Sequence, residues 1–120
     1  MNTKFIIILL AVFLVLAYCV NYQRNKRNIK LEKSEIKALI DQGAKVYDVR
    51  SQGEFRGGHY KGAMNIPLND VKNRLKDFGD KDKPVIVYCH SGRRSGFAKK
   101  ILEDNGYTKV YNAGGLSDLP

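Results

Sequence analysis

The hydrophobic pattern of the chain begins with one long apolar run. Residues 5–20 contain no charged or strongly polar side chain, and the uncharged stretch extends to Gln23. At about 1.5 Å per residue, a helix of this length comes close to crossing the roughly 30 Å of hydrocarbon in a bilayer. Residues 1–23 are therefore predicted to be an N-terminal membrane anchor that contacts the membrane through residues 5–22.

The residues that flank the apolar run predict its orientation. Only Lys4 and the amino terminus precede the run, whereas the basic residues Arg24, Lys26, Arg27 and Lys30 follow it. The positive-inside rule then gives a single-pass protein of the cell membrane whose C-terminal domain faces the cytoplasm, with residues 24–32 as a basic juxtamembrane linker. The alternative is a signal peptide that is cleaved on export. Against it, no small-x-small cleavage site follows the run.

From residue 33 onward, the pattern changes to short segments of helical and strand character. Ile36, Leu39 and Ile40 share one helix face, and the run Val-Ile-Val-Tyr-Cys at 85–89 is typical of a strand buried on both faces. The predicted elements are a helix over 34–42 capped by Ser34, a strand over 45–49, a capped turn at 51–54, a helix from Asn69 or Asp70 to Phe78, a polar turn at 79–84, the strand 85–89, a helix from about Ser95 to Asn105 and a strand over 109–112. This order predicts one α/β domain at 33–120, with a small, mostly parallel sheet flanked by helices and preceded by one transmembrane helix.

Charge adds one constraint to this picture. The chain has 21 basic and 12 acidic residues, for a net charge of +9. Five of the basic residues lie within residues 1–30, which contain no acidic residue, so residues 31–120 hold 16 basic against 12 acidic. The domain shows no basic stripe with interleaved aromatic residues, so no nucleic-acid partner is expected. Its mild positive charge favours small anionic substrates.

The positions of the cysteines and histidines argue against a disulfide and against a metal site. Cys19 lies in the apolar run and Cys89 at a strand end, so an intramolecular disulfide is not expected. The two histidines, His59 and His90, are isolated in the sequence, and no pair of residues has metal-ligand spacing. Neither a metal nor a cofactor is therefore predicted.

Candidate chemistry is concentrated in the loop that follows the strand 85–89. Cys89 leaves this strand and faces the start of a helix, whose unpaired N–H groups and positive dipole end favour a thiolate over a thiol. Arg93 and Arg94 add positive charge, and Gly92 permits the backbone angles with which successive amides form an anion nest. The loop predicts a nucleophilic sulfur and an anionic substrate; the alternative is a buried, inert structural cysteine.

The segment Cys89-His90-Ser91-Gly92-Arg93-Arg94-Ser95 resembles the active-site loop of the rhodanese (sulfurtransferase) family, in its Cys-x-x-Gly-x-Arg-Ser form. Further blocks are similar to the family pattern: Asp48-Val49-Arg50, Glu54-Phe55, the GHYKGAMNIP segment at 58–67 and the closing Gly114-Gly115. The related protein phosphatases need a loop one residue longer, with arginine six positions after cysteine instead of five. The resemblance covers roughly residues 33–119 and implies a membrane-anchored, single-domain rhodanese.

The resemblance also implies a reaction. The Cys89 thiolate would take the outer sulfur of thiosulfate or of a persulfide donor, and the resulting persulfide would pass it to a nucleophilic acceptor. The implied substrate-binding residues are those of the loop, namely His90, Ser91, Gly92, Arg93, Arg94 and Ser95. Arg94 would bind the donor or hold the loop, Arg93 would steer anions, and Asp48 with Arg50 would form a supporting ion pair. The expected partners are a small anionic sulfur donor and a protein sulfur carrier.

The sequence also bears on the role of His59 and on two other classes of function. His59 is interpreted as a hydrogen-bonded loop residue and not as a general base, because nothing in the sequence brings a carboxylate to it. A non-catalytic sulfur-carrier or protein-binding module at the membrane stays open as an alternative. A thiolate-dependent phosphatase is less favoured, because the loop is one residue too short.

Overall fold

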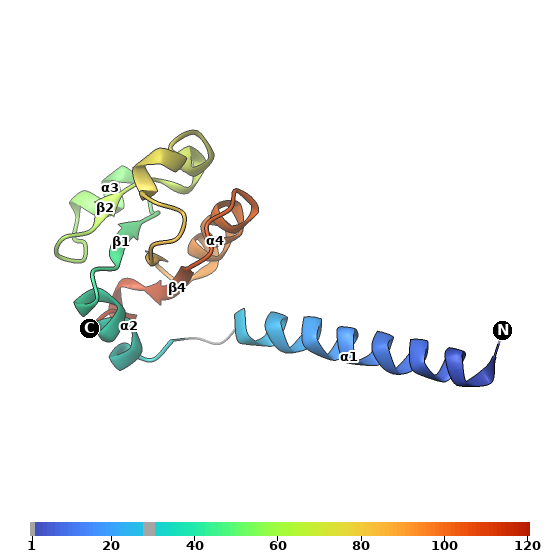
Figure 1. Ribbon diagram of the computed structural model, residues 1–120. Coiled ribbons are helices and arrows are strands. Elements are labelled where there is room, and N and C mark those ends of the chain that lie inside the picture. The colour runs from blue at the N-terminus through green and yellow to red at the C-terminus, as the bar shows by residue number, and fades with distance from the viewer. Residues whose placement is uncertain (1, 28–30) are drawn as a thin grey trace.

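The computed structural model of the chain describes residues 2–27 and 31–120, and it combines one long N-terminal helix with an α/β domain (Figure 1). The helices and strands are α1 (Thr3–Arg27), α2 (Lys33–Asp41), β1 (Lys45–Asp48), α3 (Gln52–Arg56), β2 (Met64–Asn65), β3 (Val85–Cys89), α4 (Arg93–Asp104) and β4 (Val110–Gly115). Three 3₁₀ segments complete the domain: η1 (Leu68–Asn73), η2 (Leu75–Phe78) and η3 (Leu116–Asp118). The predicted α/β class, with an apolar helix in front of the domain, is confirmed.

The four strands form one parallel sheet in the order β2-β1-β3-β4. Tyr47 of β1 is in register with Val87 of β3 on one side and with Met64 of β2 on the other. Because all strands run in the same direction, their carboxyl ends meet at one edge, where α/β sheets bind ligands. We call this the catalytic edge because Cys89, the nucleophile that the sequence predicts, lies there at the end of β3, a strand whose five residues are all buried.

Alternate residues of the strands point to opposite faces of the sheet, and each face carries its own core. On one face, Tyr47 and Val87 pack with Ala98 and Leu102 of α4 and with the 3₁₀ segments. On the other face, Ile86 packs in a cluster that includes the buried residues Ile36 of α2, Val46, Tyr88, Ala113 and Leu119. The central strand β3 is therefore covered on both faces, as its continuous apolar sequence predicts.

The predicted helix from Asn69 or Asp70 to Phe78 is wrong in type. The structure has η1 and η2 instead, separated at Arg74, although the apolar stripe is correct, since Val71 and Phe78 are buried. Tyrosine hydroxyls bond the carbonyls of Leu75 and Asp77, which would be among the last four of the predicted helix and have no partner inside it. Tyr47 Oη donates to the carbonyl of Asp77 at 3.0 Å, and Tyr107 Oη lies 2.6 Å from the carbonyl oxygen of Leu75.

Smaller differences concern where the elements begin and end. Glu32 caps α2, one residue before the helix starts, in a capping box with Glu35, so the predicted cap Ser34 is wrong. The helix α4 begins at Arg93, two residues before the predicted start, because Gly92 takes the cap position. In β4, the strand continues through the glycine pair to Gly115. The capping box predicted for Ser51 and Glu54 is confirmed.

The helix α1 exposes its apolar side chains along its whole length. Its segment Thr3–Arg24 is long and apolar enough to cross a bilayer, and none of it is buried against the rest of the described chain. The same length and composition fit a signal sequence near an N-terminus. The helix continues past residue 23 into the predicted linker 24–32, of which residues 28–30 lie outside the described residues.

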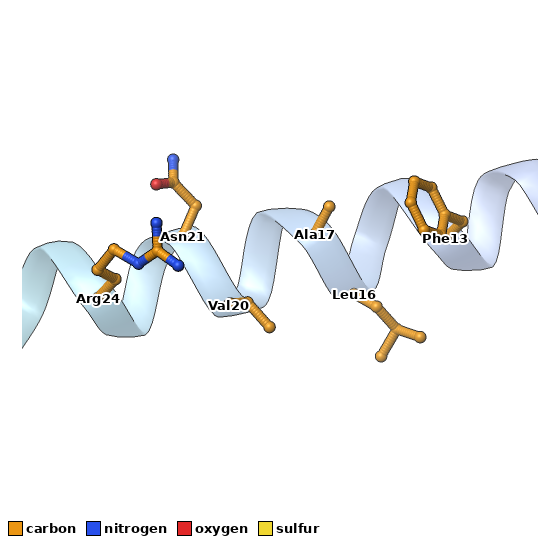
Figure 2. Close-up of a pocket in the computed structure, with 6 residues that line it drawn as sticks. All are labelled: Phe13, Leu16, Ala17, Val20, Asn21 and Arg24. Atoms are coloured by element: carbon orange, nitrogen blue, oxygen red, sulfur yellow. The ribbon is translucent and has the colours of Figure 1, made fainter.

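A hollow runs along α1, far from the domain's candidate chemistry. Figure 2 shows that its lining comes from this one helix, with the residues Phe13, Leu16, Ala17, Val20, Asn21 and Arg24. A groove between side chains of a single exposed helix encloses no ligand. We therefore place the functional site at the catalytic edge of the sheet.

Candidate active site

The sulfur of Cys89 is enclosed by hydrogen-bond donors. Cys89 is 1% exposed, and its Sγ accepts a hydrogen bond from the backbone N–H of Gly92 at 3.0 Å. The hydroxyl of Ser95, a fully buried residue in the first turn of α4, lies 3.3 Å from the same sulfur. The loop therefore wraps around Sγ as the sequence-based interpretation of an anion nest requires.

The turn at Gly92 makes this wrapping feasible. Gly92 has φ 93°, in the left-handed region that favours glycine, and a Cβ at this position would press against the backbone of Gly114. Its carbonyl accepts hydrogen bonds from the N–H of Gly96 at 2.9 Å and from Asn112 Nδ2 at 2.8 Å. The Gly92 carbonyl is thus held by α4 and β4, and the Gly92 N–H is held by the Cys89 sulfur.

Asn112 of β4 is a site residue that the sequence analysis did not single out. Its Oδ1 accepts from the N–H of Gly114 at 3.0 Å, which fixes the orientation of the side-chain amide. The same Oδ1 lies 2.7 Å from the Ser95 hydroxyl. The only sequence signal for this role is a polar residue inside a short strand directly before the glycine pair.

The Ser95 hydroxyl has one proton and two acceptors within reach, Asn112 Oδ1 and Cys89 Sγ. When Cys89 is a neutral thiol, Ser95 can accept from the S–H group and donate to Asn112. When Cys89 is a thiolate, the same proton can turn to the sulfur and stabilise its charge. Because Asn112 Oδ1 can only accept, it competes with the sulfur for this proton, and the Ser95 hydroxyl donates to one of the two at a time.

These contacts set the acidity of the thiol. Burial acts first and would raise the pKa of Cys89, because it disfavours the charged form. Hydrogen bonds from the Ser95 hydroxyl and from the backbone N–H groups of Ser95, Gly92 and Ser91 act in the opposite direction and prevail. As a result, the pKa of Cys89 lies below that of an ordinary cysteine, so a larger fraction of Cys89 is thiolate at a given pH.

This shift predicts how Cys89 titrates. In a Cys19→Ser background, the thiolate absorbance of Cys89 should appear at a lower pH than that of free cysteine, and Ser95→Ala should move its midpoint upward by removing a donor to Sγ. Ser91→Ala is the matched control, because it keeps the backbone N–H that Ser91 contributes. An equal midpoint in the two alanine variants would contradict the role of the Ser95 hydroxyl.

Arg94 ties the loop to α3. Its guanidinium donates two hydrogen bonds to the Glu54 carboxylate, at 2.7 and 3.0 Å. This contact is the main reason that the pKa of Glu54 falls to about 2, although burial opposes it; Ser51 adds further hydrogen bonds. Both side chains are more than a third exposed, so the pair contributes little to stability and mainly fixes geometry. Arg93, by contrast, is exposed.

A second, buried pair supports the catalytic edge. Asp48 and Arg50 form an ion pair at 2.7 Å, in agreement with the sequence-based expectation, and both residues are buried. Arg50 also donates to the carbonyl of Gly58 at 2.7 Å, and its guanidinium lies 5.6 Å from the centroid of the Tyr88 ring. Asn65 Nδ2 donates to the carbonyls of Asp48 and Arg50. The pair therefore holds the 58–65 segment against the ends of β1 and β3.

Gly115 provides the space that the loop needs. It is in register with Cys89, and a Cβ at this position would collide with the carbonyl oxygen of His90. Gly115→Ala should therefore displace the loop and slow the persulfide formation that the sequence predicts for Cys89 on the order of 100-fold, as expected for a small misplacement of reacting groups. Gly53→Ala is the control, since a Cβ there meets nothing. Equal rates in both variants, measured by intact mass over time, would contradict this constraint.

The side chains of His90 and Ser91, and the loop residue His59, make none of the hydrogen bonds to Cys89 Sγ described above. His90 and Ser91 are exposed on the loop, and only the backbone of Ser91 acts on the thiol. His59 Nδ1 is 2.8 Å from the carbonyl oxygen of Phe55, on whose ring the imidazole stacks. The interpretation of His59 as a hydrogen-bonded loop residue is confirmed.

A parallel sheet whose central strand ends in a cysteine, enclosed by loop amides and a helix start, defines a class of proteins that stabilise anionic sulfur. Comparison identifies the family within this class. Residues 32–118 match the model of the rhodanese-like domain, and the chain belongs to that family.

Two curated relatives and one solved structure illustrate the likeness. The thiosulfate sulfurtransferase PspE of Escherichia coli is 51% identical over 73 residues, which cover 60% of this chain and 70% of the relative. The uncharacterized protein YqhL of Bacillus subtilis is 38% identical over 116 residues, 96% of this chain and 90% of its own. A rhodanese structure with anions from E. coli superposes with a TM-score of 0.61 at 47% identity, covering 65% of this chain and 95% of the other.

Proposed function

We propose that the protein is a sulfurtransferase that carries sulfane sulfur as a persulfide on Cys89. The observation that supports this most directly is the buried Sγ with converging donors from Gly92 and Ser95. A site of this kind stabilises negative charge on sulfur in both states of the proposed cycle, the thiolate and the persulfide. The lowered pKa of Cys89 increases the fraction of the nucleophilic thiolate, so the proposed mechanism includes no separate general base.

The proposed reaction has two steps. In the first, Cys89 Sγ attacks the outer sulfur of thiosulfate; a new S–S bond forms, the old one breaks, and sulfite leaves with the bonding electron pair. In the second, an acceptor thiolate or cyanide attacks the outer sulfur of the Cys89 persulfide and regenerates the Cys89 thiolate. A persulfide donor would enter the first step in the same way, with its own thiolate as the leaving group.

The two loop arginines are expected to differ. Arg94 holds the loop through Glu54, and the charge of Cys89 adds to the raised pKa of Arg94 after the dominant effect of Glu54. Arg94→Ala should therefore lower kcat/KM for thiosulfate by about tenfold or more, since a misplaced loop costs activity steeply. Arg93→Ala should lower it less and mainly at low ionic strength, as expected for an exposed steering charge. Equal losses would show that the two roles are wrongly assigned.

We also propose that α1 anchors the domain in the cell membrane. Support comes from its apolar length, its basic C-terminal flank and the fact that the alignment with YqhL is long enough to include α1. The excess of basic residues after α1 favours a domain that faces the cytoplasm. The cytoplasm is also the compartment that keeps a catalytic thiol reduced. Cleavage and export would instead leave a chain that lacks the first residues, which the mass of the mature protein reveals.

Intact mass is the decisive test of the sulfur chemistry. The full chain, purified in detergent and exposed to thiosulfate, should gain the mass of one sulfur atom, and cyanide should remove it. A gain with polysulfide or a protein persulfide but not with thiosulfate would keep the mechanism and change the donor. No gain with any donor would overturn the proposal in favour of a binding module, and release of phosphate from a phosphorylated substrate would favour the phosphatase.

A further inference from the structure

The chain that leaves the apolar helix enters the domain at the catalytic edge of the sheet. Leu31, the first described residue after α1, packs against the cluster that contains Leu119. Residues 31–34 line a shallow hollow together with Asp118. The C-terminal end of the chain accordingly lies beside α2 (Figure 1).

Asp118 connects this entry point to the active-site loop. Its Oδ2 accepts a hydrogen bond from the N–H of Gly115 at 2.9 Å. Gly115 is in turn the register partner of Cys89, and its backbone lies against the carbonyl of His90. A short series of contacts therefore joins the start of the domain to the residues around the catalytic sulfur.

The tether is short. Arg27, at the end of α1, and Leu31 are separated by four residue steps, which span at most about 14 Å even when fully extended. The three helical residues beyond Arg24 add only about 4.5 Å. The catalytic edge is therefore held close to the membrane or other structure that contains α1. The opposite edge of the sheet, with the turn at 79–84, lies farther away.

The surface of the catalytic edge carries charges of both signs and one exposed aromatic ring. Its exposed basic side chains include Lys33, Arg93 and Arg56 at the end of α3. Acidic side chains lie there as well, with Asp70 exposed at the start of η1 and Asp118 beside Gly115. Phe97 lies one turn after Arg93 on α4, and 53% of it is exposed, which offers an apolar side chain at this edge.

We propose that the catalytic edge faces the headgroups of the bilayer that holds α1, so that Cys89 exchanges sulfur with donors or acceptors at the membrane surface. This inference rests on the membrane anchor in the proposed function and adds an orientation to it. The short tether keeps this edge near the bilayer, and the exposed Phe97 offers it an apolar side chain. A component held at that surface reaches the loop without leaving the membrane.

Energy transfer between the domain and labelled lipid headgroups tests this orientation. The full chain with Cys19→Ser and Cys89→Ser receives a single cysteine by Ser91→Cys on the loop, or by Asp82→Cys at the opposite edge. Each variant is labelled from outside in vesicles of phosphatidylcholine and phosphatidylglycerol. Transfer should be more efficient from position 91 than from position 82. Equal transfer, or more from position 82, would overturn the proposal.

Two controls separate the sources of failure. Arg56→Cys marks the same edge and replaces Ser91→Cys if circular dichroism shows that the latter is misfolded. In pure phosphatidylcholine, the difference between the two edges should persist, because the tether and not the charge of the lipid sets the orientation, and its loss would overturn this reason. A chain that does not float with vesicles lacks the anchor itself, which overturns this orientation while the mass test of persulfide formation stands independently.

Discussion

Cys89→Ser is expected to abolish persulfide formation and sulfur transfer while the domain stays folded. A serine hydroxyl is smaller than the thiol, so it introduces no clash, and it can accept the hydrogen bond from the Gly92 N–H that holds the loop. An alkoxide is far harder to form than a thiolate, and no stable sulfur adduct would result. The mass gain with thiosulfate and the turnover to cyanide should both fall to background.

Cys19→Ser is the matched control for this substitution. Cys19 is the other cysteine of the chain, lies on α1 and is exposed there, so its loss should leave turnover unchanged. Circular dichroism and thermal unfolding would show that Cys89→Ser keeps the fold. Turnover retained in Cys89→Ser, or lost in Cys19→Ser, would show that sulfur is carried elsewhere.

Asp48→Ala is expected to be the most destabilising single substitution among the supporting residues. Asp48 is 0% exposed and Arg50 is 7% exposed, so the variant leaves a buried guanidinium without its carboxylate. Breaking a buried pair in this way costs about 3–5 kcal/mol. Arg50 would also lose the fixed direction from which it donates to Gly58, so the 58–65 segment should loosen together with the sheet edge. Denaturant unfolding of the full chain in detergent measures the loss.

Two comparisons isolate the reason for this loss. The double variant Asp48→Leu/Arg50→Met removes both charges and should recover much of the stability, because no unpaired charge is left. Lys37→Ala breaks the exposed pair with Asp41 and should cost less than about 1 kcal/mol. If Asp48→Ala and Lys37→Ala were equally mild, the Asp48–Arg50 pair would not be a structural support.

Much of the fold followed from local sequence because local physical rules acted alone there. The run at 85–89 is apolar at every position, and only a strand covered on both faces hides such a run. Ser51 and Glu54 have the spacing at which each side chain reaches the other's backbone, so their capping box formed as predicted. In the 68–78 region the predicted apolar stripe is correct, but the chain forms two 3₁₀ segments, which contact the hydroxyls of Tyr47 and Tyr107. Those tyrosines are distant in sequence, so the local pattern does not reveal these contacts.

The cysteine loop could be found in the sequence because its residues are contiguous: the strand end, the glycine, the two arginines and the serine follow one another within seven positions. Parts of the site contributed by other elements could not be found in this way. Asn112 and Gly115 reach the loop from β4, and Glu54 reaches Arg94 across 40 residues of chain. Hydrogen bonds and close contacts depend on distances in space, and those distances arise only when β3, β4 and α3 meet at one edge of the sheet.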